Sequence, residues 1–248
     1  MDLNTFFKQN PKAAIAFSGG VDSSYLLYAA LQSGADVRAY YVKTAFQPQF
    51  ELEDAERLAK ELNAPLTVIR ADVLSHEEVT VNPPDRCYYC KRVVFGQIGA
   101  AAAKDGFTLL LDGTNASDDE GDRPGMRALR ELSVRSPLRE CGLTKAEIRK
   151  RSKEAGLFTW NKPAYACLAT RIPSGDVITG EKLLATEKAE QFLFSLGFQD
   201  FRVRRMGSAA KLQLREEQFA LALRERKAIL EALKPDYSAV LLDLEARG

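Results

Sequence analysis

Short apolar runs alternate with amphipathic stretches over the first half of the chain. The apolar runs end at Phe17 or occupy Val37–Val42, Leu66–Arg70 and Thr108–Leu111. They have the length and composition of buried strands. Helical periodicity predicts helices at Tyr25–Leu31, at Glu51–Leu62 and from Lys91 to about Asp105. Strands that alternate with helices predict an α/β, Rossmann-like fold with a mainly parallel sheet covered on both faces.

The pattern changes near residue 176. From there it predicts helices at Glu181–Leu196 and Glu216–Leu233, and strands at Phe201–Met206, Lys211–Leu214 and Ala239–Leu244. We therefore expect two domains, a large α/β domain over residues 1–175 and a small α+β domain over residues 176–248. The second domain is expected to serve substrate binding or oligomerisation.

Two segments connect these patterns. Lys145–Ala155 is predicted to be a helix, because Thr144 and Glu147 have the spacing of a capping box at its start. The stretch 160–175 contains two prolines and a glycine, which predicts an ordered loop without regular structure.

Composition narrows the classes of function. The chain has 35 Lys and Arg against 34 Asp and Glu, so its net charge of +1 gives no case for binding nucleic acid or an anionic membrane. No apolar run is long enough for a membrane span, and the N-terminus lacks the basic start of a signal peptide. We therefore expect a cytoplasmic protein. Four cysteines without a secretory signal argue against a disulfide framework, and a single histidine, His76, excludes a zinc site with two histidines from one chain.

The stretch Ser18–Ser24 stands between the first strand and the first long helix. Its two glycines allow phosphate oxygens to approach backbone N–H groups at a helix N-terminus, and Asp22 is a candidate ligand for Mg²⁺. A second glycine turn follows Leu111, at the same edge of the predicted sheet, so the two turns are expected to share one ligand. The predicted ATP contacts are Ala16, Ser18, Gly19, Gly20, Val21, Asp22, Ser23, Ser24, Val42, Gly113 and Thr114.

This first turn differs from two common nucleotide motifs. It lacks the Lys of a Walker loop and the third Gly of the dinucleotide fingerprint. The run Ser-Gly-Gly-Val-Asp-Ser-Ser instead resembles the PP-loop of the ATP pyrophosphatase superfamily. That resemblance implies release of pyrophosphate and an adenylylated substrate.

Three of the four cysteines are candidates for chemistry. Cys87 and Cys90 form a Cys-x-x-Cys pair, which is compatible with redox, zinc or iron–sulfur chemistry. Cys167 lies in the proline-containing loop, a suitable place for a thiol that meets substrate. A zinc site would also need Cys141, which is more typical of a buried small residue.

Nearly the whole chain resembles the LarE family of ATP-dependent sulfur transferases. The motifs that carry the resemblance are Ser18–Ser24, Arg86–Lys91, Gly113–Asn115, Arg123–Met126, Val134–Leu138, Asn161–Gly175 and Arg202–Arg204. The resemblance implies that pyridinium-3,5-biscarboxylic acid mononucleotide is adenylylated and converted to thiocarboxylates for a nickel-pincer cofactor. It also implies a sulfide donor and a symmetric homo-oligomer.

The resemblance assigns the sulfur-donor position to Cys167. Some members sacrifice the sulfur of that cysteine, whereas others hold a [4Fe–4S] cluster through three cysteines and transfer a sulfide bound to its open iron. The pair Cys87 and Cys90 places this chain with the second kind, with ATP, Mg²⁺ and the cluster as cofactors.

The substrate phosphate requires basic side chains. Arg202 and Arg204 are two apart on a predicted strand, hence on one face, and match the phosphate-binding arginines of the family. Arg171 is a further candidate. The alternative for these arginines is a solvated face.

Several alternatives stay open at this point. Zinc bound by all four cysteines, or a sacrificial Cys167 without metal, would replace the cluster. The same loop also occurs in tRNA thiolation enzymes, although the near-zero net charge weighs against that function. A non-catalytic nucleotide sensor on this fold is the third possibility.

Overall fold

The chain folds into two units, each with a sheet of its own. The computed structural model describes residues 1–118 and 124–247, so the motif residue Arg123 lies outside the described residues. The first unit comprises Met1–Val73 and Asp85–Lys162, and the second comprises Leu74–Pro84 and the chain from Pro163 onward. This division differs from the expected boundary at residue 175.

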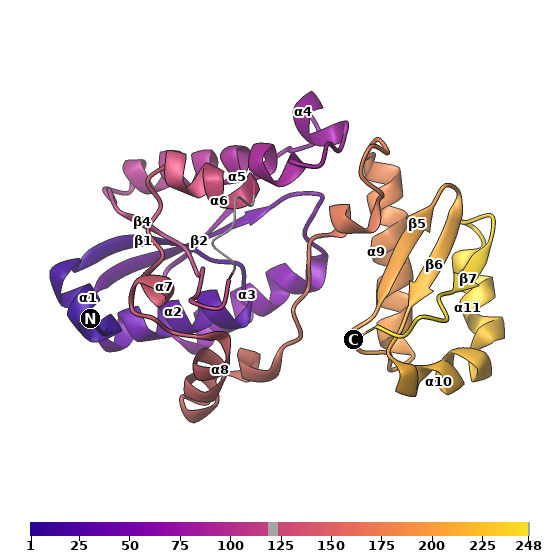
Figure 1. Ribbon diagram of the computed structural model, residues 1–248. Helices are drawn as coiled ribbons and strands as arrows, with labels where there is room; N and C mark the ends of the chain where they lie inside the picture. The colour runs from indigo at the N-terminus through magenta and orange to yellow at the C-terminus, as the bar shows by residue number, and fades with distance from the viewer. Residues whose placement is uncertain (119–123, 248) are drawn as a thin grey trace. The chain divides into compact units, whose positions relative to one another are not determined.

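The first unit contains a parallel sheet, as predicted. Its strands are β1 (Lys12–Ala16), β2 (Asp36–Lys43), β3 (Leu66–Arg70) and β4 (Leu110–Leu111), in the order β3-β2-β1-β4 (Figure 1). Every neighbouring pair is parallel. β4 is shorter than predicted because only its two leucines pair with β1, and Leu111 also forms a bridge with Arg135. The expected α/β, Rossmann-like class is confirmed.

Helices cover both faces of this sheet. They are α1 (Leu3–Gln9), α2 (Val21–Gln32), α3 (Gln49–Glu61), α5 (Arg86–Lys104), α6 (Pro124–Glu131), α7 (Pro137–Glu140) and α8 (Lys145–Glu154), followed by the 3₁₀ turn η1 (Phe158–Asn161). Ile15 and Tyr41 pack in a cluster with residues of α1, α2 and α3, whereas Ala14 and Tyr40 pack with residues of α5. α5 and α2 lie on opposite faces of the sheet (Figure 1). This alternation is the period of two expected of strands buried on both faces.

The second unit is built around a smaller mixed sheet. Its elements are α4 (Glu77–Thr80), η2 (Leu168–Arg171), α9 (Gly180–Ser195), β5 (Arg202–Met206), β6 (Ala209–Gln213), η3 (Glu216–Gln218), α10 (Phe219–Arg224), α11 (Arg226–Leu233) and β7 (Val240–Leu242). β5 and β6 are antiparallel, and β6 and β7 are parallel. The single helix predicted over Glu216–Leu233 is broken at Glu225, where the chain changes direction between α10 and α11 (Figure 1).

Asn82 explains why the short segment Leu74–Pro84 belongs to the second unit. Its side chain is 1% exposed and donates to the carbonyl oxygens of Pro173 at 2.7 Å and Asp176 at 3.2 Å. Its own carbonyl accepts from the backbone N–H of Gly175 at 2.8 Å. Asn82 also has a positive φ of 55°, which Asn tolerates better than most residues.

Within the described ranges, no helix combines the length and the apolar character that crossing a bilayer requires.

Replacing Asn82 with Ala should destabilise the second unit by about 2–4 kcal/mol, because buried hydrogen bonds are lost and Ala disfavours a positive φ. Asn63→Ala is the matched control, since Asn63 is exposed with a φ of 51° and loses only the backbone preference. Urea unfolding followed by circular dichroism measures both. Equal losses in the two variants would show that the hydrogen bonds of Asn82 contribute nothing.

Candidate functional site

The first glycine turn joins β1 to α2. Gly19 has a φ of 70°, and a Cβ built on it would lie 3.1 Å from the Cβ of Ala55. Both facts require glycine at this position. Gly20 occupies the N-cap position of α2 and provides no side-chain cap. The N–H groups of the first helical turn are therefore available to an anion, which the helix dipole also favours.

Serine hydroxyl groups hold this turn in shape. The Oγ atoms of Ser18 and Ser23 are 3.1 Å apart, and the Ser23 hydroxyl donates to the carbonyl of Gly20 at 3.3 Å. Because these hydroxyls bond within the loop, the backbone amides are the better phosphate donors. Ser24 is fully buried, and its Oγ has no hydrogen-bond partner among the residues described. This orphaned hydroxyl, with the uncapped helix, fits a site that receives a polar ligand.

The second glycine turn meets the first, as the sequence predicts. A Cβ built on Gly113 would lie only 2.9 Å from the backbone N of Ser23, so no other residue fits without movement. On either side of Gly113, the hydroxyl of Thr114 donates to Asp112 at 2.5 Å. Ser136 donates to the same carboxylate at 2.6 Å. Asp112 thus holds the second turn in shape and ties it to Ser136.

Asp22, the predicted magnesium ligand, already has two partners. Lys145 Nζ lies 2.5 Å from one carboxylate oxygen, and Asn115 Nδ2 lies 3.4 Å from the other. Burial raises the pKa of Asp22, and the hydrogen bond from Lys145 opposes that shift. A cation at Asp22 would therefore share the carboxylate with a lysine that sequence reasoning missed.

Lys145 occupies an unusual position. It is the first residue of α8, directly after Thr144, whose predicted capping box with Glu147 is present. A positive charge there opposes the dipole of its own helix. This unfavourable interaction is visible in the sequence, and it could have indicated that Lys145 contacts a group outside its own helix. The PP-loop contains no lysine, and the fold provides one from a distant segment.

A second lysine touches the first turn. Lys162 Nζ lies 2.7 Å from the carboxylate of Asp54 and 3.5 Å from the carbonyl oxygen of Gly19. The segment before it is held by Arg149, which donates to the carbonyls of Trp160 at 2.7 Å and of Lys162 at 2.9 Å. Two ammonium groups therefore flank the PP-loop, each paired with a carboxylate.

The cysteine pair lies at the start of α5, in the first unit. Cys87 is exposed, and Arg86 Nη2 lies 3.8 Å from its sulfur; Cys90 is half-buried. Next to Cys90, the aliphatic stem of Lys91 runs 3.2 Å from the position that a Cβ on Gly125 would take. Burial lowers the pKa of Lys91, and the nearby carboxylate of Asp112 opposes this effect most. Lys91 therefore carries its charge near Asp112 of the second glycine turn.

The remaining two cysteines lie in different units. Cys141 packs against the core of the first unit, and burial raises its pKa, as expected for a structural thiol. Cys167 belongs to the second unit, where it precedes η2. None of the four cysteines forms a disulfide. In the described part of the chain, no group of three or more His, Cys, Asp or Glu side chains is arranged to hold a metal ion.

Three arginines donate hydrogen bonds to the backbone of the loop around Cys167. Arg171 donates to the carbonyl of Ala166 at 2.7 Å, and Arg202 donates to that of Ala164 at 2.8 Å. Arg204 donates to the carbonyl of Thr170 at 2.8 Å and to Gln213 at 2.5 Å. These contacts define the shape of the loop that carries the predicted sulfur donor.

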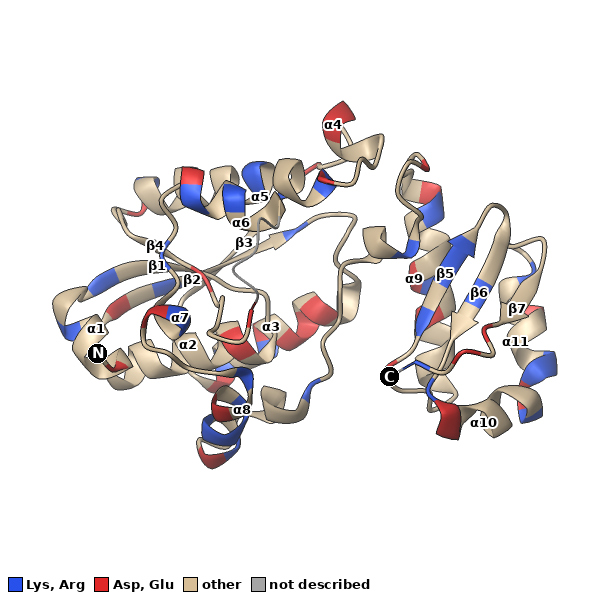
Figure 2. Ribbon diagram, viewed as in Figure 1, with Lys and Arg blue, Asp and Glu red and all other residues tan. Residues whose placement is uncertain are grey.

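The same arginines were the candidates for phosphate binding. Arg171 is 1% exposed and directs its donors to protein groups, which favours a role in holding the loop. Arg204 is half-buried on β5, among the basic residues of that strand (Figure 2). Burial lowers the pKa values of Arg202 and Arg204, and the charges of Arg171 and Arg247 add to the effect. Clustered guanidinium groups of this kind favour a bound anion.

Comparison with known proteins gives several similarities. The family described as "Queuosine biosynthesis protein QueC" matches residues 12–81. The uncharacterized protein slr1717 of Synechocystis is 36% identical over 221 residues, which cover 88% of this chain and 81% of that protein. The pyridinium-3,5-bisthiocarboxylic acid mononucleotide synthase of Lactiplantibacillus plantarum is 35% identical over 211 residues, or 84% and 76% of the two chains. The uncharacterized protein MJ0830 of Methanocaldococcus jannaschii is 31% identical over 245 residues, which cover 98% of this chain and 93% of that protein.

Replacing Gly113 with Ala should weaken binding of Mg·ATP about tenfold or more, because the new methyl group must displace the backbone at Ser23. Gly96→Ala is the control, since a Cβ there meets nothing within 4 Å. Isothermal titration calorimetry measures both affinities. Unchanged binding in Gly113→Ala would mean that the meeting of the two turns has no part in holding the nucleotide.

Proposed function

The chain belongs to the LarE family of sulfur transferases, and we propose that it adenylylates the carboxylates of pyridinium-3,5-biscarboxylic acid mononucleotide and converts them to thiocarboxylates. The proposal is supported by 35% identity to a protein named for the bisthiocarboxylic acid product. The structural observation that carries it is the close approach of Gly113 to Ser23, which joins the two glycine turns at the start of α2.

The chemistry follows from the reactivity of carboxylates. A carboxylate is a poor electrophile, so one of its oxygens first attacks the α-phosphorus of ATP and pyrophosphate leaves. A sulfur nucleophile then attacks the acyl carbon of the adenylate, and AMP leaves with the electron pair of the broken C–O bond. One ATP is used for each carboxylate.

The residues around the PP-loop suit the first step. We assign the amides at the start of α2 and the Lys145 ammonium to the departing pyrophosphate. Asp22 and the orphaned hydroxyl of Ser24 are the oxygen groups that would hold Mg²⁺, which neutralises phosphate charge when bound. Ala16, Val42 and Thr114, at or near strand ends, remain the proposed contacts for the rest of the nucleotide.

Cys167 is the proposed source or carrier of sulfur in the second step. Three thiolates, Cys87, Cys90 and Cys167, are the ligand type that a [4Fe–4S] cluster requires, and three leave one iron open. The described residues contain no ready set of three metal ligands, so the proposal rests on residue type and on the resemblance.

Arg202 and Arg204 are the proposed contacts for the phosphate of the substrate. Arg204 directs two nitrogens to Gln213 and Thr170, and Arg202 directs two to backbone carbonyls. These acceptors are neutral, and the carboxylate of Asp200 lies 3.9 Å from Arg202 Nη1, so it balances the charge of Arg202 in part. The remaining positive charge of the two arginines is the feature that supports phosphate binding. The same assignment would link the substrate to the loop of Cys167.

Lys145→Met should lower the rate of substrate-dependent pyrophosphate release by roughly 10- to 150-fold, the effect of losing one charge-assisted contact of about 1.5–3 kcal/mol. Lys150→Met on the exposed face of the same helix is the control and should be neutral. A coupled pyrophosphate assay measures the rates. Products of ADP and orthophosphate, in the unmodified protein, would contradict the proposed reaction.

The source of sulfur is tested with the four cysteine variants. A cluster predicts brown protein under anaerobic conditions and loss of activity in Cys87→Ala and Cys90→Ala as complete as in Cys167→Ala, with Cys141→Ala active. A sacrificial donor predicts activity without Cys87 or Cys90 and a mass loss of about 34 Da at Cys167, expected when a thiol is eliminated as hydrogen sulfide. Intact mass before and after turnover, with iron analysis, separates the two.

A further inference from the structure

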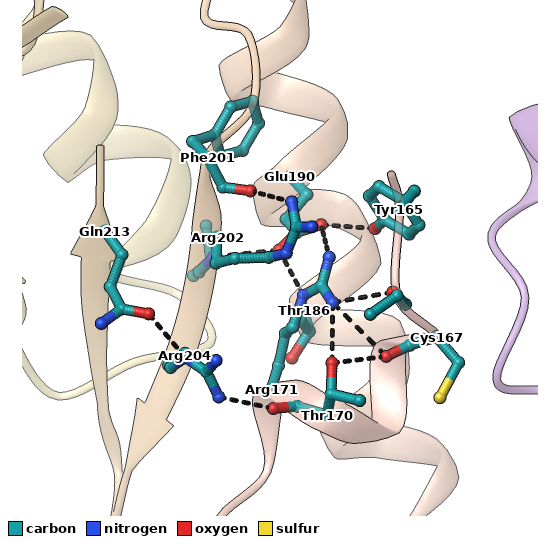
Figure 3. A network of polar contacts seen from close by, with 12 residues as sticks. Tyr165, Cys167, Thr170, Arg171, Thr186, Glu190, Phe201, Arg202, Arg204 and Gln213 are labelled. Atoms are coloured by element: carbon teal, nitrogen blue, oxygen red, sulfur yellow. Dashed lines mark hydrogen bonds and ion pairs between the residues drawn. The ribbon is translucent and has the colours of Figure 1, made fainter. Parts of the chain in front are cut away.

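Glu190 is a buried carboxylate with an unusually complete set of partners. It lies on α9, is 1% exposed, and accepts from Arg171 Nε at 2.8 Å and from Arg171 Nη2 at 3.0 Å. It also accepts from the backbone N–H of Val203 at 2.9 Å and from the hydroxyl of Tyr165 (Figure 3). One carboxylate therefore joins α9, β5 and the loop before η2.

The third nitrogen of the Arg171 guanidinium holds the cysteine backbone. Arg171 Nη1 lies 2.7 Å from the carbonyl oxygen of Ala166 and 3.4 Å from that of Cys167. The hydroxyl of Thr170 donates to the same Cys167 carbonyl at 2.8 Å and accepts from Arg171 at 2.8 Å. Figure 3 shows the sulfur of Cys167 pointing away from Arg171, while its carbonyl faces the guanidinium.

Stability alone does not account for this ion pair. Removing two charges from water costs several kcal/mol per ion, and apolar side chains of similar volume are often equally stable in such positions. The charged pair instead fixes the orientation of the two side chains, since a bidentate guanidinium–carboxylate contact holds both groups in one plane. Because Arg171 Nη1 contacts the carbonyls of Ala166 and Cys167, the ion pair also fixes the orientation of the peptide groups on both sides of Cys167.

We propose that Arg171, Glu190 and Thr170 are positioning residues that fix the direction of the Cys167 side chain for sulfur transfer and are not needed for adenylylation. The inference rests on the proposed function of Cys167. With the peptide groups on both sides held, only the χ1 rotation of the cysteine remains to set the place of its sulfur. A displacement of about 1 Å in a reacting atom reduces a rate by roughly 100-fold.

Two half-reactions of the full-length protein separate positioning from general damage. Thr170→Val removes the hydroxyl that contacts the Cys167 carbonyl and keeps the size of the side chain. It should reduce thiocarboxylate formation, measured by mass spectrometry, about tenfold or more, and leave substrate-dependent pyrophosphate release within about twofold. Glu190→Gln should act in the same direction, and Thr170→Ser should restore sulfur transfer.

Tyr237→Phe is the matched control in the second unit. It removes a buried hydroxyl that lies 3.3 Å from Thr186 Oγ1 and also contacts Arg205, and neither contact is a hydrogen bond to the loop of Cys167. Both half-reactions should remain within about twofold of the unmodified protein. Equal loss of the two half-reactions in Thr170→Val would overturn the proposal and assign a purely structural role to these residues, as would unchanged sulfur transfer.

Hydrogen exchange gives a readout that does not depend on the substrate. In Thr170→Val, amides of residues 166–172 should exchange about tenfold faster, while those of α9 and β5 keep their protection. Exchange that rises throughout the second unit, or nowhere, would refute the positioning role. If the unmodified protein releases no pyrophosphate with the mononucleotide, the proposed function fails, and hydrogen exchange still decides whether these residues order the loop.

Discussion

The close approach of Gly113 to Ser23 is the constraint on which the first unit depends. β4 and β1 are adjacent parallel strands, so the turns that follow them leave the sheet at the same edge. A Cβ at residue 113 would stand 2.9 Å from the Ser23 nitrogen, so the fold leaves space there for a hydrogen atom only. The start of α2 and the second glycine turn are thereby fixed against each other, while Asp112 and the PP-loop serines hold the shape of the two turns by bonds of their own.

Charged side chains from distant parts of the sequence form ion pairs beside the PP-loop and beside the loop of Cys167. Lys145 reaches Asp22 from α8, and Lys162 reaches Asp54 from the segment before Pro163. In the second unit, Arg171 and Glu190 form an ion pair that is almost fully buried. Lys145 and Lys162 are each held near the PP-loop by a carboxylate, so the structure fixes their places while a ligand with more negative charge can compete for them. The buried pair of Arg171 and Glu190 instead holds the loop of Cys167.

The sequence was most informative where the cause of a structure is local. Short apolar runs between helical segments predicted the parallel sheet and its helical cover on both faces, and the spacing of Thr144 and Glu147 predicted the start of α8. The meeting of Gly113 with the start of α2 followed from one rule about parallel strands. Contacts between remote segments were beyond such rules, so Lys145 at Asp22 and Glu190 beneath the Cys167 loop were missed. The break at Glu225 has no proline or glycine to mark it, and the attachment of residues 74–84 to the second unit depends on the side chain of Asn82.

The second unit is discontinuous in sequence, which limits how it can be exchanged between proteins or separated from the first unit. The chain passes between the units three times, at Val73–Leu74, Pro84–Asp85 and Lys162–Pro163. A module that is appended by gene fusion needs only one such passage. The second unit therefore cannot be exchanged between proteins as a simple C-terminal cassette, because a break after Lys162 would leave Asn82 without its partners at Pro173 and Asp176. A separately expressed second unit would have to include residues 74–84.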